Sequence, residues 1–203
     1  STFPVVVTAI EALLERQVNV GGMICSMHAA IPLVIVNGPI RHRIGLNCAF
    51  NVFGQGWRAN ATIGRVVQLS LVSLGGAKPG EADRAPIGQP GNFTFCIAEN
   101  EEESPWDPLH VARGLRREDS AVTVIGAEPP HSLNNQAAEH PRDLLHTLTT
   151  MMANAASMNA FLQGESVVVH APEHAHLIAR FGWTKNDVRQ YLFEHARTPI
   201  ADL

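Results

Sequence analysis

Two stretches of this 203-residue chain carry side chains that could perform chemistry. The first is the loop GQGWRANATIG, in which Gly54 and Gly56 precede Arg58, Asn60 and Thr62. Glycines let backbone amides converge, and a following helix offers unpaired N–H groups with the positive end of its dipole. The loop therefore predicts a site for a carboxylate or an oxyanion, while close packing under a buried helix explains the two glycines equally well.

The same loop does not match the common nucleotide-binding patterns. Ala59 occupies the third glycine position of GxGxxG, and no Lys-Ser or Lys-Thr pair follows the glycines as it would in a Walker loop. Nucleotide binding is therefore weakly supported.

The second stretch is FTFCIAENEEESPWDPLH, in which Cys96 and Glu99 stand at the end of a predicted strand, with Asn100, Glu101, Trp106 and His110 close behind. These groups could form a thiolate nucleophile with acid–base partners, or a carboxylate-rich metal site. Neighbouring carboxylates raise the pKa of a thiol, and free cysteines are usually buried, so a structural role is favoured for Cys96. The acidic run is interpreted as a solvated loop, with Glu99 as the exception.

Two further patterns resemble metal sites. CSMH at 25–28 supplies two ligands but lacks the second pair of a zinc site, so His28 is kept as a candidate proton carrier. HAPEH at 170–174 fits HxxEH, but Pro172 places His170 outside the following helix, whereas the motif needs both histidines on one helix face. The sequence assigns no metal ligand and identifies no cofactor.

The apolar pattern predicts the scaffold that must position these groups. Helical spacing and capping residues predict helices at 2–17, 61–74, 142–162, 172–182 and 184–196. Short apolar runs predict strands at 32–36, 93–98, 121–125 and 166–169, with a further candidate at 21–26. This order predicts an α/β fold, a three-layer sandwich with a mostly parallel sheet of four to five strands, whose ligands bind at the carboxyl ends of the strands.

The whole chain, 1–203, is expected to form a single α/β domain. The Pro- and Gly-rich segment 78–92 is too long for a simple turn, and it is interpreted as a lid-like loop. Because the chain stops on RTPIADL without a closing element, we expect a fragment or subunit of a longer architecture.

Composition limits the partners. The net charge is −4 without a basic block, which argues against nucleic acid, and Pro32, Asn37 and Pro39 interrupt the best apolar run, which argues against a membrane span. Three scattered cysteines do not form a secreted disulfide framework, so we expect a cytoplasmic protein. The expected partners are a small-molecule substrate and other chains, in a homo- or hetero-oligomer.

Five strings resemble one known family: PLVIVNGPI, GQGWRANATIGR, PGNFTFCIAENEE, SPWDPLHV and APEHAHLIARFGWTKNDVRQYLFEHAR. They resemble the second domain of the UGSC-type (seleno)proteins, a family named for a Sec/Cys-Gly-Ser-Cys motif in a separate N-terminal domain. The resemblance implies an association with thiol or selenol chemistry, although this chain lacks that motif and the Gly-rich C-terminal segment of longer members. The matching motif positions are Asn37, Arg58, Asn60, Thr62, Cys96, Glu99, Asn100 and His110.

The combined prediction is an enzyme, or an enzyme subunit, that acts on a small polar, carboxylate-bearing substrate by lyase or hydrolase chemistry. The expected substrate-binding residues are Arg58, Asn60, Thr62, Asn37 and Asn100. The expected catalytic residues are Cys96, as nucleophile or pocket wall, with Glu99, His110 and His28. The alternatives are a non-catalytic subunit that completes a partner chain's pocket, a metal-dependent enzyme using His28, Glu99 and His110, and a thiol-redox enzyme.

Overall fold

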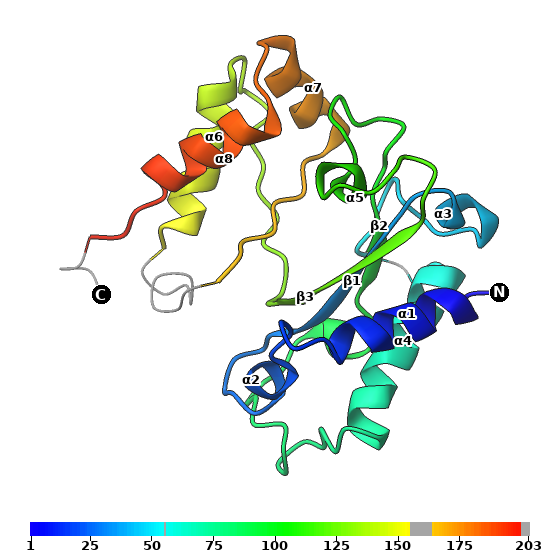
Figure 1. Cartoon of the computed structure of the whole chain (residues 1–203). Coiled ribbons are helices and arrows are strands. Elements are labelled where there is room, and N and C mark those ends of the chain that lie inside the picture. The colour runs from blue at the N-terminus through cyan, green and yellow to red at the C-terminus, as the bar shows by residue number, and fades with distance from the viewer. Residues whose placement is uncertain (55, 155–163, 200–203) are drawn as a thin grey trace. The chain divides into compact units, whose positions relative to one another are not determined.

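The computed structural model describes residues 1–54, 56–154 and 164–199 (Figure 1). Contacts between Cα atoms divide the chain into two compact units. The first unit is Ser1–Glu102 with Asp107–Pro130, and the second is Glu103–Trp106 with His131–Leu203.

The first unit is built on a three-stranded mixed sheet with strand order β2-β1-β3. The central strand, β1 (Ile31–Asn37), is parallel to β2 (Cys96–Ala98), with Val34 opposite Cys96. It is antiparallel to β3 (Ala121–Ala127), with which it pairs along its whole length. The carboxyl ends of β1 and β2 therefore lie at one edge of the sheet, beside the start of β3.

The connection from β1 to β2 contains α3 (Ile40–Arg43), the long helix α4 (Arg58–Ser73) and the short 3-10 helix η1 (Pro90–Asn92). Two hydrogen bonds show that α4 runs antiparallel to β1. Asn60, near the start of α4, donates to the carbonyl of Cys96, which lies opposite Val34, whereas Gln68, further along α4, donates to the carbonyl of Pro32. The first turn of α4 therefore lies toward the carboxyl ends of β1 and β2.

The core of the first unit follows the alternation of side chains along β1. Val34 and Val36 face α1 (Phe3–Leu13) and α4, which lie on the same side of the sheet (Figure 1). Leu33 and Ile35 face the opposite way. The helix α4 approaches the sheet closely, since a Cβ atom at Gly64 would lie 2.5 Å from the backbone nitrogen of Phe95. Two further short helices, α2 (Val20–Ile24) and α5 (Leu109–Ala112), complete this unit.

The second unit contains the helices α6 (Pro141–Met152), α7 (Pro172–Arg180) and α8 (Lys185–His195). Leu144, Leu145, Ile178, Val188 and Leu192 form its buried core. A capping box between Thr184 and Asp187 starts α8, as the sequence predicts.

The predicted sheet was wrong in size and direction. The described residues contain three strands, of which one neighbouring pair is parallel and the other antiparallel, and not a mostly parallel sandwich of four to five strands. Residues 21–26 lie largely in helix α2, and 166–169 are not a strand. An apolar run predicts a buried segment but carries no information about strand direction, and here β3 is only half-buried and 166–169 are mostly exposed.

The predicted helices were mostly correct. The structure confirms helices within 2–17, 61–74, 172–182 and 184–196, and α4 begins three residues earlier than expected, at Arg58. The helix predicted over 142–162 ends at Met152, and residues 155–163 lie outside the described residues.

Candidate functional site

The carboxyl ends of β1 and β2 hold a cluster of polar side chains, which we call the strand-end cluster. Its members come from β1 and the following turn, from the segment after β2, and from α5. They are Asn37, Arg41, Glu99, Glu101, Glu102 and His110. All six belong to the first unit.

Asn37 joins two of the carboxylates. Its side-chain nitrogen donates to Glu99 Oε2 at 2.6 Å and to Glu101 Oε1 at 3.0 Å. The next residue, Gly38, donates its backbone N–H to the same Glu101 oxygen at 2.7 Å. Gly38 has φ of 80°, and a Cβ atom there would lie 2.1 Å from the carbonyl oxygen of Asp119, so only glycine fits this turn.

Arg41 supplies the positive charge of the cluster and is only 2% exposed. Its guanidinium lies 3.0 Å from Glu101 Oε2, donates to both carboxylate oxygens of Glu102, and donates to the carbonyl of Glu99. The hydrogen bond from Arg41 is the main cause that lowers the pKa of Glu102 to about 2. The buried guanidinium therefore holds the acidic segment after β2 against the turn after β1.

His110 is the member whose ring has no hydrogen-bond partner. Its side chain is 0% exposed, and neither ring nitrogen has a partner within the described part of the chain. The carboxylate oxygen Glu101 Oε1 lies 3.9 Å from His110 Nδ1. Glu99 fixes the helix that carries this histidine, because its Oε2 accepts the backbone N–H of Leu109 at 2.7 Å.

A buried polar network that only holds the fold together satisfies nearly all its polar atoms. Here the exceptions are Asn37 Oδ1 and the two ring nitrogens of His110. A neighbouring imidazole and carboxylate can together take up and return a proton, and the hydrogen bonds of such pairs are often long before substrate binds. The arrangement is therefore suited to general acid–base chemistry.

The predicted anion site lies at the first turn of α4, which packs against the start of β2 through Asn60 and Cys96. Arg58 and Thr62 are exposed, and their side chains form no hydrogen bond or ion pair within the described residues. The side chain of Asn60 is buried, and all its polar atoms form hydrogen bonds with the backbone. It accepts the N–H of Asn47 and donates to the carbonyls of Asn47 and Cys96. Arg58 and Thr62 are thus available to a ligand, whereas Asn60 holds the loop.

Cys96 lines a small cavity of about 90 Å³, together with Asn60, Phe95 and residues of the 47–57 loop. Burial raises the pKa of the Cys96 thiol to about 12, so it stays protonated at neutral pH and is a poor nucleophile. Arg58 and Glu99 do not line this cavity. The structure therefore favours Cys96 as a wall.

His28 lies at the opposite end of the sheet from the strand-end cluster. It precedes β1, whereas Asn37 ends it, and a strand of this length spans about 20 Å. The segment 78–92 is fixed near that same end, because Gln89 donates to the carbonyls of Ala29 and Ala127. Neither His28 nor this loop is close to His110.

Asn100 is half-buried beside Glu99, and its side chain forms no hydrogen bond with the described residues. Sequence reasoning missed Arg41 and Glu102, and it named Glu101 in the second stretch without including it among the expected site residues. Glu101 and Glu102 were assigned to a solvated acidic run, yet the side chain of Glu101 is only 8% exposed. The sequence held one signal for this pairing. Arg41 follows β1 by four residues and the acidic run follows β2, so parallel pairing of the two strands brings them together.

Among the described residues, no group of three or more His, Cys, Asp or Glu side chains is arranged to hold a metal ion. In the same part of the chain, no helix has the length and apolar character needed to cross a membrane.

Comparisons with models of protein families, with curated proteins and with solved structures found no match. The resemblance to the UGSC-type family therefore stays a prediction.

Proposed function

We propose that the first unit is an enzyme domain, or an enzyme subunit, that transfers protons on a small polar, carboxylate-bearing substrate in a lyase or hydrolase reaction. The observation that carries this proposal is His110, whose buried ring has no hydrogen-bond partner among the described residues and lies 3.9 Å from Glu101. It stands at the carboxyl ends of two parallel strands, where α/β folds usually bind their ligands.

The roles follow from the contacts. Glu101 and His110 move the proton, because they are neighbouring acid–base groups and neither ring nitrogen of His110 has a hydrogen-bond partner among the described residues. Arg41 and Asn37 hold Glu101 in place and keep a counter-charge beside it. The substrate carboxylate is received by Arg58 and the unpaired N–H groups at the start of α4, where the helix dipole is positive.

The buried state of His110 sets a condition on this mechanism. Because the ring is 0% exposed, substrate reaches it only when the segment around α5 moves outward. The hydrogen bond from the Leu109 N–H to Glu99 is the contact that such a movement would break. Glu99 is therefore proposed to hold the closed state, and not to react directly.

The experiment is a screen of small hydroxy acids, amino acids and their amides and esters, followed by NMR for loss of substrate. The active substrate is then measured with Arg58→Ala and Cys96→Ala variants whose folding is checked by circular dichroism. We expect Arg58→Ala to raise KM and Cys96→Ala to leave kcat unchanged. A folded Cys96→Ala variant without turnover would contradict the assignment and favour thiol chemistry.

A further inference from the structure

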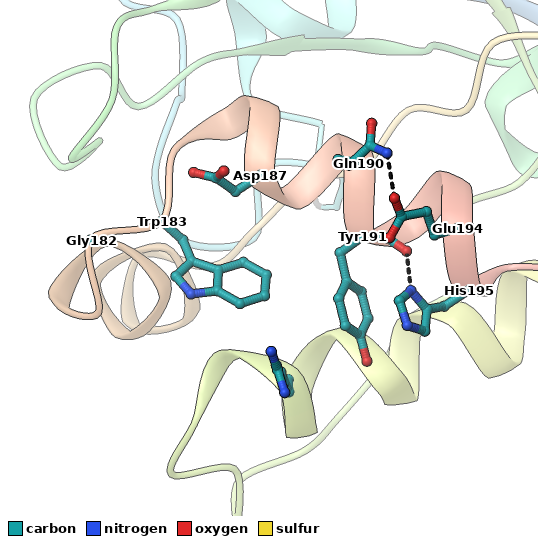
Figure 2. Close-up of a pocket in the computed structure, with 8 residues that line it drawn as sticks. Gly182, Trp183, Asp187, Gln190, Tyr191, Glu194 and His195 are labelled. Carbon is teal, nitrogen blue, oxygen red and sulfur yellow. Dashed lines mark hydrogen bonds between the residues drawn. The ribbon is translucent and has the colours of Figure 1, made fainter.

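A second place in the molecule is built like a binding site, and nothing in the proposed function uses it. One face of α8 in the second unit borders an open groove of about 610 Å³ (Figure 2). Clefts of this size are typical of sites for small molecules. The groove is lined by Arg142, Gly182, Trp183, Asp187, Gln190, Tyr191, Glu194 and His195.

Three aromatic rings form one wall of this groove. Tyr191 and His195 are stacked, with ring centroids 4.0 Å apart and planes 10° apart, and Trp183 lies 5.9 Å from Tyr191. The wall is fixed at both ends. The indole N–H of Trp106 donates to the carbonyl of Trp183, and His195 Nδ1 donates to the carbonyl of Tyr191.

The hydrogen bond of His195 also determines what the ring offers to a ligand. A carbonyl oxygen only accepts, so Nδ1 carries the proton and Nε2 of the neutral ring is left as an acceptor. In Figure 2 the rings of Tyr191 and His195 lie side by side and point away from α8 in the same direction.

The charged side chains of the groove do not neutralise one another. Arg142 forms no ion pair with either Asp187 or Glu194, although all three line the same space. Hydrogen bonds from Thr184 lower the pKa of Asp187, so its carboxylate is ionised at neutral pH. Gln190 donates to Glu194 and orients that carboxylate.

We propose that this groove binds a small zwitterion with an aromatic side chain, that is, a free α-amino acid of the phenylalanine type. Arg142 provides the planar fork that suits a carboxylate. Glu194 and the Nε2 acceptor of His195, which are neighbours on α8, suit an ammonium group, and Asp187, about two helical turns away, adds negative charge to the groove. The rings of Trp183 and Tyr191 suit an aromatic side chain, since offset or tilted ring pairs are favourable.

The test is isothermal titration calorimetry on the full chain with four probes: L-phenylalanine, phenethylamine, 3-phenylpropionate and L-alanine. Each of the last three lacks one of the features that the groove recognises. We expect L-phenylalanine to bind best, with each of the others at least about tenfold weaker.

Two arginine variants assign the carboxylate contact. Arg142→Ala is expected to weaken L-phenylalanine about tenfold and to leave phenethylamine unchanged. Arg189→Ala is the matched control, because Arg189 is exposed on the same helix as Tyr191 and does not line the groove. Circular dichroism confirms that both variants fold.

Three results would overturn the proposal. One is the absence of detectable L-phenylalanine binding at ligand concentrations up to about 10 mM, because a weaker Kd would correspond to a very small binding free energy. Another is equal binding of all four probes, which would indicate an apolar surface only. The third is an equal loss in both arginine variants. None of these outcomes depends on the chemistry proposed for the first unit.

Discussion

The two units differ in the burial and pairing of one arginine side chain in each. In the first unit Arg41 is 2% exposed, and its guanidinium contacts Glu101 and Glu102. In the second unit Arg142 is exposed and borders a groove whose carboxylates it does not contact. A charge that is buried and paired holds the fold, because removing its partner leaves an uncompensated ion. A charge that is exposed and unpaired costs little to change and remains available to a ligand.

The comparison is tested most strongly by removing the buried guanidinium. Arg41→Met would leave Glu101 buried without its counter-charge, so we expect the free energy of unfolding to fall by about 3–5 kcal/mol. Urea denaturation of the full chain measures it. Arg116→Met is the control, since that ion pair with Asp119 is on the surface, and we expect a much smaller loss. Similar losses in both variants would show that the cluster does not support the fold.

A smaller effect is expected at the turn that carries Asn37 into the cluster. Gly38→Ala places a Cβ atom against the Asp119 carbonyl at positive φ, so we expect a loss of about 2–3 kcal/mol. Gly45→Ala is matched in φ but meets no neighbouring atom, and we expect about 1 kcal/mol from backbone strain alone. Thermal unfolding of both variants separates the steric part, and equal midpoints would contradict it.

The smallest effect concerns acid, and it sets the second unit apart from the first. Burial lowers the pKa of His170 from 6.5 to about 4, in a site where its ring meets Trp106 edge to face. The neutral ring is compatible with folding above pH 6.5. As the pH falls from 6.5 toward 4, the unfolded chain binds a proton first, and stability is lost. After allowance for partial exposure we expect a loss of about 1–2 kcal/mol.

His170→Phe keeps the edge-to-face contact and removes the titration, so its midpoint should change less with pH over that window. In the first unit, Glu102 has a pKa lowered to about 2, so its contribution persists until the pH falls below about 4.5, its unperturbed range. An unchanged pH dependence in His170→Phe would exclude this histidine as the acid-sensitive group.

Part of the strand-end cluster could be predicted from the sequence. Asn37 and Glu99 end or follow short apolar runs, and side chains at the ends of neighbouring strands meet. His110 was predicted only because it follows the second of these strands closely in the sequence. Arg41 could not be assigned in this way, because its carboxylate partners lie about sixty residues further along the chain. The direction of β3 was also not predicted, since its continuous apolar run is typical of a buried parallel strand, whereas β3 is half-buried and antiparallel to β1.

The site predicted around Arg58 shows the same limit. Glycines and donors before an apolar run correctly indicated that a long helix begins here, although it begins at Arg58 and not at Ala61. The sequence did not show that Asn60 points inward and is consumed by the backbone of Asn47 and Cys96. The burial of one side chain within a turn depends on the neighbouring strand, which local spacing does not encode.

The central claim is that Glu101 and His110 act as one proton-transfer unit. The direct test is kcat for Glu101→Gln, His110→Gln and the double variant, with folding confirmed for each. We predict that each single change lowers kcat by about 100-fold or more, and that the double change lowers it little further, because groups that act together are not additive. Folded variants that keep the turnover of the unaltered chain would contradict the claim.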